Sequence, residues 1–168
     1  MPWFAIKTSK DFAAETMLTP LCESVFFPME KRPDSEGKMH LRPAIPHVLF
    51  IRTSHQNALQ LELRGRDIDD RMIPFWIYRL EKGGDIQPIP DHQMAILRLL
   101  TAVDNTKCEI YHKTDFEKGM RVRVTGGIFA GQIGHVQRVR KNKHVIVKIE
   151  GVCAVLLPFI HPDLLQPL

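Results

Sequence analysis

The stretch Phe116–Val136 constrains the fold of this chain more than any other part of the sequence. It contains an alternating run, Met120–Val124, then a glycine-rich loop, Gly126–Gly131, and a second apolar run that opens after Gly134. Period-two alternation is typical of a half-buried strand, and glycine accepts the positive φ that tight reversals require. The pattern therefore predicts two short antiparallel strands joined by a compact turn.

Two more apolar runs follow, His144–Glu150 and Val152–Leu157, and each is reached across a short polar turn. Four or five short strands with such tight connections bury a core by curling into a small barrel. We therefore expect an all-strand module at the C-terminal end of the chain.

Charge is distributed unevenly over the 168 residues, a length that suits one ordinary domain or two small ones. Residues 1–104 carry 13 Lys and Arg against 14 Asp and Glu, whereas residues 105–168 carry 10 against 5. A basic C-terminal module suits RNA or an acidic protein partner, and it is equally compatible with a solvated surface.

The three cysteines, Cys22, Cys108 and Cys153, are far apart and form no C-x-x-C pair. This usage is typical of reduced packing thiols in a cytoplasmic protein. The N-terminal segment lacks an apolar signal-peptide core, and no run approaches the length of a membrane span. We therefore expect a cytoplasmic protein without a membrane partner.

The first 104 residues mix strand and helix patterns. The expected strands are Trp3–Lys7, Ser24–Met29, Pro43–Arg52 and 74–80, and the expected helices are 10–19, Ser54–Arg64 and 89–103. This sequence of elements predicts an α+β unit in which helices cover a largely antiparallel sheet.

Local signals define the first helix and the segments around it. Ser9 or Asp11 is expected to cap the helix and Pro20 to end it. Its inward face is expected to carry Phe12, Ala13, Thr16 and Met17. The polar span Glu30–Arg42 is expected to be a mobile hairpin tip or loop.

The predicted domain organisation is an N-terminal domain over 1–104, a polar linker over 105–114 and a strand-rich domain over 115–168. The linker is polar and has no apolar periodicity.

The order of motifs resembles the NusG family of transcription elongation factors, which join an NGN domain to a KOW domain. The residues that carry the resemblance are Trp3–Ile6, Phe26–Pro28, Ile45–Ile51, Pro88–Pro90 and the glycine-rich KOW-like stretch. The resemblance implies an α+β fold with an NGN-type mixed sheet and a small SH3-like β-barrel (KOW).

Within the family the chain is similar to the specialised RfaH-like and capsular-operon antiterminators. It departs from the general pattern at His47 and Val48, where the family usually has Gly or Asn followed by Tyr. Lys7 also stands where the RfaH-like form has an aromatic residue. These departures imply a less aromatic polymerase-binding pocket.

The resemblance implies that the N-terminal domain binds the clamp of RNA polymerase through an apolar patch. The candidate polymerase-binding residues are Trp3, Ile45, Val48, Phe50 and Trp76. Desolvated apolar anchors carry most of the binding energy of such interfaces. Each candidate could instead be a core residue, Phe50 and Trp76 above all, whereas Trp3 and Val48 are expected to be at least partly exposed.

The middle helix carries two further candidate contacts. Ser54, His55 and Gln56 stand where RfaH-like proteins touch the opposite polymerase jaw, although Ser54 is the expected helix cap. Arg64, Arg66 and Arg71 could lie near non-template DNA. Ion pairing with the neighbouring Asp67, Asp69 and Asp70 is the stronger expectation.

In the KOW-like domain, Phe129 with Ile128 occupies the loop position that presents an aromatic residue to a partner in this family. The partner is a ribosomal small-subunit protein or a termination factor in known members. Phe129 is expected to be a contact residue because a small barrel rarely buries a loop tip. Arg138, Arg140, Lys141 and Lys143 could contact nascent RNA or form a solvated turn.

An enzyme is the first rival interpretation. The chain has no H-E-x-x-H, G-x-S-x-G or G-x-x-x-x-G-K-[ST] motif, so neither catalysis nor a cofactor or metal is expected. The second rival is a ribosomal or RNA-binding KOW protein, against which the balanced charge of residues 1–104 counts. The favoured interpretation is a monomeric transcription elongation or antitermination factor.

Overall fold

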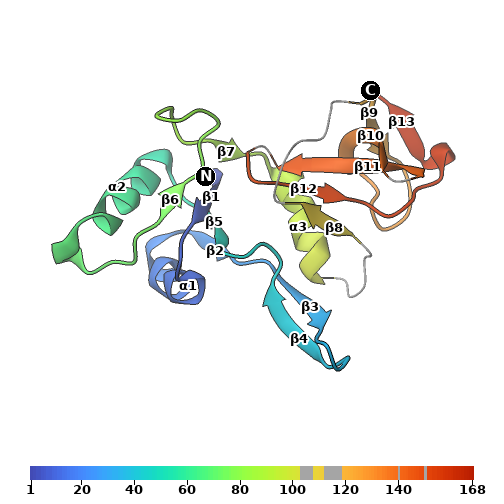
Figure 1. Cartoon of the computed structure of the whole chain (residues 1–168). Coiled ribbons are helices and arrows are strands. Elements are labelled where there is room, and N and C mark those ends of the chain that lie inside the picture. Colours follow the sequence, from blue (N-terminus) through green and yellow to red (C-terminus); the bar gives the residue numbers. More distant parts are fainter. Residues whose placement is uncertain (103–107, 112–118, 140, 150) are drawn as a thin grey trace. The chain divides into compact units, whose positions relative to one another are not determined.

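The chain divides between Pro90 and Asp91 into two units, Met1–Pro90 (unit 1) and Asp91–Leu168 (unit 2) (Figure 1). The computed structural model describes residues 1–102, 108–111, 119–139, 141–149 and 151–168. Both helices and strands are present, in agreement with the α+β class expected from the sequence. The finer boundaries at 104 and 114 stay a prediction.

Unit 1 is built on a five-stranded antiparallel sheet with the order β2-β5-β1-β6, in which β7 also pairs with β1. Its strands are β1 (Trp3–Lys7), β2 (Ser24–Phe26), β5 (Val48–Arg52), β6 (Trp76–Ile77) and β7 (Pro88–Ile89). The central strands β1 and β5 are buried along nearly their whole length, which explains their continuous apolar runs.

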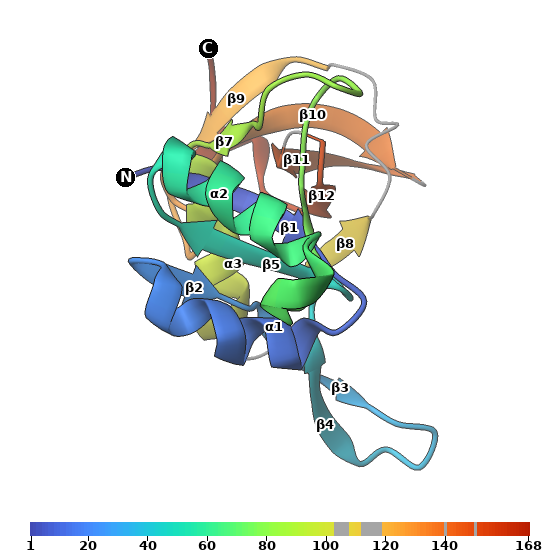
Figure 2. The same ribbon diagram turned by 90° about the vertical axis from the view of Figure 1, so that its left-hand side faces the viewer.

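Two helices cover one face of this sheet, α1 (Asp11–Leu18) and α2 (His55–Gly65) (Figure 2). A 3-10 turn follows each of them, η1 (Thr19–Leu21) and η2 (Ile68–Asp70). The core between sheet and helices consists of Phe4, Ile6, Leu18, Phe27, Leu49, Ile51, Ala58, Leu61, Phe75, Ile77 and Ile86.

The first helix differs from its predicted form. Its buried residues are Ala14 and Leu18, spaced four apart on one face, whereas Phe12 is exposed and packs edge-on against Phe27 with ring centroids 5.2 Å apart. The N-cap residue is Lys10, which makes no side-chain cap hydrogen bond, so Ser9 is not the cap; the Asp11 carboxylate accepts the N–H of Phe12 at 2.9 Å in the first turn. Pro20 does not follow directly on α1 but lies in η1, where its missing N–H costs nothing.

The polar span after β2 forms an ordered hairpin that projects from the sheet of unit 1 (Figures 1 and 2). Its strands β3 (Met29–Pro33) and β4 (Met39–Pro43) pair only with each other among the described residues. Asp34 organises the tip, because its carboxylate accepts hydrogen bonds from the backbone N–H groups of Glu36 and Lys38, both at 2.9 Å. The hairpin alternative of the sequence expectation is therefore confirmed, and the loop alternative is wrong.

A buried ion pair fixes the short strand β6. The Glu62 carboxylate on α2 accepts hydrogen bonds from both terminal nitrogens of Arg79, at 2.8 and 3.1 Å, and from the backbone N–H of Ile77 at 2.6 Å. Desolvation raises the pKa of Glu62, but these hydrogen bonds and the charges of Arg79 and Arg66 outweigh it, so the pKa lies below its ordinary value. The predicted strand over 74–80 is reduced to Trp76–Ile77.

Unit 2 begins with α3 (Asp91–Ala102), which packs near β11, and continues as a six-stranded antiparallel sheet. The strands are β8 (Glu109–Tyr111), β9 (Arg121–Val124), β10 (Ile133–Val139), β11 (Asn142–Ile149), β12 (Cys153–Leu156) and β13 (Leu165–Pro167), the last preceded by η3 (Pro162–Leu164). Their order is β13-β9-β10-β11-β12-β8. Among the described residues, no pairing joins the end strands β13 and β8 into a closed ring.

The predicted strands of the C-terminal module agree with β9 to β12. Burial along β9 alternates as the sequence pattern requires, with Val122 and Val124 inside and the arginines outside. The strand β8 was missed, since Glu109–Tyr111 lies in the segment expected to be a linker. Residues 105–107 and 112–114 of that segment lie outside the described residues.

The last glycine of the KOW-like stretch, Gly134, marks a close approach of two strands. A Cβ atom on Gly134 would lie 2.4 Å from the backbone oxygen of Ile146. Glycine is therefore required in β10 by its contact with β11.

None of the helices in the described parts of the chain is long and apolar enough to cross a membrane.

Candidate partner-binding surfaces

The register of β1 and β5 separates the sheet of unit 1 into two faces. Phe4 pairs with Ile51 and Ile6 with Leu49, and all four belong to the core beneath the helices. Because neighbouring residues of a strand alternate between faces, the intervening residues lie on the opposite face. We call this opposite face the second face; its members include Trp3, Ala5, Phe26, Val48, Phe50 and Trp76.

Four of the five predicted polymerase-binding residues share this second face: Trp3, Val48, Phe50 and Trp76. The fifth, Ile45, precedes β5 and is buried. Trp76 lies opposite Lys7 on the neighbouring strand β6. The structure therefore brings the four strand residues together on one side of a single sheet. Their role in binding stays a prediction.

Exposure differs sharply among these residues. Trp3 and Val48, expected to be at least partly exposed, are each 3% exposed, and Phe50 is fully buried. That expectation is corrected, since both lie on the central strands β1 and β5, which are buried along nearly their whole length. Trp76 is 52% exposed because β6 is only two residues long and forms one end of the sheet order.

Sequence reasoning missed Phe26 as a member of the second face. Phe26 lies opposite Phe50 across β2 and β5, and the two rings are 6.3 Å apart. Its place within the motif Phe26–Pro28 was the available signal.

The turn that leads into β5 contains a residue with left-handed backbone. His47 has φ 66°, and its N–H donates a hydrogen bond to the Asp11 carboxylate at 3.3 Å. Glycine and asparagine adopt this conformation most readily. The backbone thus explains why Gly or Asn suits this position and why the histidine found here is strained.

The polar residues at the start of α2 have partners within unit 1. The Ser54 hydroxyl accepts the Asn57 N–H at 3.1 Å, so Ser54 is the helix cap that the sequence favoured. His55 lies 2.8 Å from the Asp85 carboxylate, and this hydrogen bond lowers the pKa of Asp85 below its ordinary value. Gln56 is exposed.

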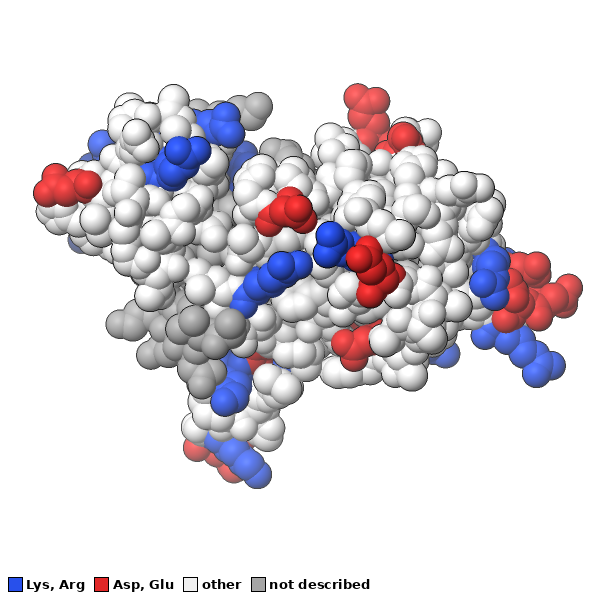
Figure 3. Space-filling model, turned by 180° about the vertical axis from the view of Figure 1, so that it is seen from behind, with Lys and Arg blue, Asp and Glu red and all other residues white. Residues whose placement is uncertain are grey.

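The arginines after α2 engage acidic neighbours. Arg64 donates a hydrogen bond to Asp70 at 2.9 Å, and a nitrogen of Arg66 lies 3.6 Å from the Glu62 carboxylate. Arg71 has left-handed backbone at the end of η2. Acidic and basic side chains are interspersed on the face that Figure 3 shows. Arg64 therefore pairs with a neighbouring aspartate, as expected, whereas Arg66 pairs with Glu62 of α2.

The glycine-rich loop of unit 2 exposes a different residue from the one predicted. Gly127 and Gly131 have φ of 78° and 88°, and the turn between them directs Phe129 inward, where it is 6% exposed. Ile128 is 58% exposed at the same turn. The expectation that Phe129 is an exposed contact is corrected, and Ile128 is the apolar residue that faces solvent.

The hairpin between β10 and β11 carries exposed basic side chains. Arg138 lies directly opposite Lys143, and Lys141 lies in the connecting turn. Like charges placed opposite each other destabilise a strand pair, and an anionic partner would relieve this cost. Arg140 lies outside the described residues.

No family model matches the chain, and no curated protein matches it. A solved structure described as "Domain interaction in Thermotoga maritima NusG" is similar to it, with 15% identity and a TM-score of 0.46. The match covers 98% of this chain and 96% of that one. At this identity and TM-score, the likeness carries no functional inference.

Proposed function

We propose that this chain is a NusG-type transcription elongation or antitermination factor that works by binding and not by catalysis. Unit 1 binds the clamp of RNA polymerase, and unit 2 recruits a partner through its glycine-rich loop. The protein acts in the cytoplasm as a monomer without a cofactor. The departures from the general pattern at His47 and Val48 favour a specialised RfaH-like or capsular-operon type, whereas Lys7 departs from the RfaH-like form itself.

The second face of unit 1 is the observation that carries this proposal. It places Trp3, Phe50 and Trp76 on the side of the sheet opposite the face covered by α1 and α2, and of these three only Trp76, at 52% exposed, is accessible to a partner. Aromatic anchors dominate the energetics of protein–protein interfaces. Trp3 and Phe50 belong to segments whose order resembles an NGN domain, and Trp76 lies on the strand β6 that pairs with β1.

Trp76 is the residue for the decisive experiment, since it is half-exposed and its removal should leave the core intact. We expect Trp76→Ala to weaken binding to core RNA polymerase by about tenfold or more, as loss of a central aromatic anchor does. Binding is measured with the full chain by interferometry. A defined paused transcription complex then shows whether the bound factor shortens the pause.

Leu63→Ala provides the matched control. Leu63 is a 64% exposed apolar residue on α2, outside the second face. Equal affinities of the two variants would contradict the proposed docking face. Wild-type protein that binds polymerase but leaves pausing unchanged would remove the elongation part of the proposal.

The exposed loop residue Ile128 is the proposed contact for the partner of unit 2, a ribosomal small-subunit protein or a termination factor. Ile128→Ala should abolish binding to that partner without changing stability, whereas Phe129→Ala should cost about 3 kcal/mol of stability because it empties a buried site. Thermal unfolding separates the two effects. Partner binding that survives Ile128→Ala would move the contact elsewhere.

A ribosomal or RNA-binding role is the second candidate, favoured by the opposed Arg138 and Lys143 of the β10–β11 hairpin. Contacts to a nucleic-acid backbone weaken steeply with salt. The two candidates are distinguished by binding to polymerase and to ribosomal RNA over a salt series. Retention by RNA alone, with a steep salt dependence, would favour the RNA-binding role.

A further inference from the structure

Unit 2 contains a cavity of about 240 Å³ whose lining is rich in basic and hydrogen-bonding side chains. It is lined by His92, Gln93, Arg121, Ile133, Gly134, His135 and Lys148. Among these described residues none is acidic. Asp91, the exposed first residue of α3, precedes His92 in the sequence but does not line the cavity.

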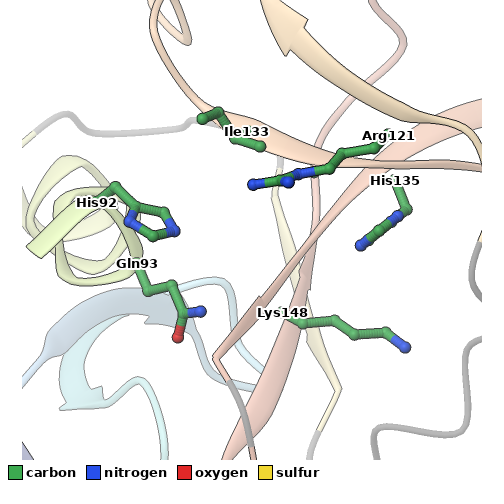
Figure 4. Close-up of a pocket in the computed structure, with 7 residues that line it drawn as sticks. His92, Gln93, Arg121, Ile133, His135 and Lys148 are labelled. Atoms are coloured by element: carbon green, nitrogen blue, oxygen red, sulfur yellow. The ribbon is translucent and has the colours of Figure 1, made fainter. Parts of the chain in front are cut away.

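The fold places the basic side chains on one side of the sheet. Arg121 of β9 pairs directly with His135 of β10, and His135 pairs with Ile146 of β11, two residues before Lys148. Directly paired residues and residues two apart share a face, so Arg121, His135 and Lys148 share one face. The first turn of α3 contributes His92 and Gln93 from the other side (Figure 4).

The side chains converge on the cavity from two directions. Figure 4 shows the Arg121 guanidinium reaching across toward His92, with His135 and Lys148 on the sheet side. The Nδ1 atom of His135 lies 3.2 Å from the backbone oxygen of Gly119, which holds the ring in place. Gln93 and Lys148 also take part in other interactions, so the charge on which the site depends is that of Arg121.

We propose that this cavity binds a phosphate group. Arginine presents a planar fork of donors to phosphate oxygens, and imidazole and amide N–H groups supply further donors around a tetrahedral anion. The volume lies below the about 300–1,000 Å³ of pockets for drug-sized ligands. The cavity therefore suits a phosphate or diphosphate and not a whole nucleotide.

The phosphate can come from two sources, a free diphosphate or the backbone of a nucleic acid. The site is separate from the exposed basic hairpin, because neither Arg138 nor Lys143 lines the cavity. It also does not depend on polymerase binding by unit 1. The probes are therefore inorganic diphosphate and a single-stranded oligouridylate.

Arg121→Ala is the test variant, and Arg123→Ala is its matched control. Both arginines are exposed on the same face of β9, two residues apart, but only Arg121 lines the cavity. We expect Arg121→Ala to weaken diphosphate binding by about tenfold or more, because it removes charge-assisted hydrogen bonds. Arg123→Ala should bind as the wild type does. Calorimetric titration of the full chain at fixed ionic strength measures both.

The results distinguish the sources and can overturn the site. Diphosphate binding that depends on Arg121, without oligouridylate binding, assigns the site to free phosphates. Oligouridylate binding that depends on Arg121 and is displaced by diphosphate assigns it to a nucleic-acid backbone. Failure of both probes to bind the wild type, or equal loss in the two variants, overturns the proposal. Arg121→Lys keeps the charge and checks that any loss in Arg121→Ala does not come from misfolding.

Discussion

Unit 1 buries large aromatic and aliphatic side chains beneath two helices, whereas unit 2 buries mainly β-branched side chains within a sheet. Phe4, Phe27 and Phe75 lie in the core of unit 1, and Val122, Val145 and Val155 are typical of the interior of unit 2. In unit 1 the Glu62–Arg79 ion pair links α2 to the segment that follows β6. In unit 2 the strands β10 and β11 approach each other closely at Gly134. The two units should therefore fail under different substitutions.

The largest expected effect is on unit 1. Glu62→Gln should lower the free energy of unfolding of unit 1 by about 3 kcal/mol, because it leaves the Arg79 guanidinium without its anionic partner. We expect the lower end of the usual cost of breaking a buried ion pair, because the Arg79 side chain is still 23% exposed. Urea unfolding followed by circular dichroism and by Trp3 and Trp76 fluorescence measures the loss. If Glu62→Gln shifted the unfolding transition of unit 2 by the same amount, the two units would not unfold independently.

The same carboxylate predicts a pH dependence. Because the folded pKa of Glu62 lies below its ordinary value, its stabilising contribution is present above the unfolded pKa of roughly 4.3 and is lost as the pH falls below it. Wild-type unit 1 should thus lose stability more steeply than Glu62→Gln between about pH 4.5 and pH 3. Parallel pH profiles of the two proteins would contradict this assignment.

The next effect is on unit 2. Gly134→Ala places a Cβ atom 2.4 Å from the Ile146 oxygen and 2.8 Å from a Val145 methyl carbon, so the strands must separate. We expect a loss of about 2 kcal/mol confined to unit 2, as overpacking costs. Gly127→Ala is an informative companion, since its Cβ would meet open space and only the positive φ of 78° would be strained. If Gly127→Ala lost more stability than Gly134→Ala, backbone strain would matter more than the close contact between β10 and β11.

A smaller gain is expected at the turn before β5. His47→Gly should stabilise unit 1 by about 0.5 kcal/mol, because relief of the left-handed backbone is partly offset by the greater freedom of glycine in the unfolded chain. His47→Ala keeps a Cβ atom and serves as the control. If the alanine variant gained as much as the glycine variant, backbone strain would not be the cause.

The smallest effect concerns reactivity and leaves stability unchanged. Burial raises the pKa of the Cys22 thiol to about 11 and that of Cys153 to about 12. Both thiols should therefore resist alkylation at pH 8 until their own unit opens, since the thiolate is the reactive form. Mass spectrometry after timed labelling reads unit 1 through Cys22 and unit 2 through Cys153. Rapid labelling of either thiol in the native protein would be inconsistent with its raised pKa.

Regular periodicity made some elements predictable. The strand Trp3–Lys7 and the Ser54 cap of α2 agree with the structure, because continuous apolar runs and a capping hydroxyl act locally. The alternation in β9 likewise fixed which side chains are buried. These features depend on neighbours in sequence.

The differences arise where distant contacts decide. Phe12 was expected inside, but α1 turns Ala14 and Leu18 to the sheet and leaves Phe12 to pack on Phe27 at the edge. Phe129 and Ile128 look equivalent in the sequence, and only the turn geometry sets which one is buried. The cavity beside α3 joins Arg121 to His92, residues with no sequence signal that connects them.

The β3–β4 hairpin offers a practical handle on the molecule. At its tip Gly37 has φ 82° with open space around it, and the backbone there is held by Asp34 and not by the sheet of unit 1. Exposed tips of this kind tolerate inserted sequence. A fluorophore or short epitope placed after Glu36 would report where unit 1 sits in a larger assembly while leaving its core undisturbed.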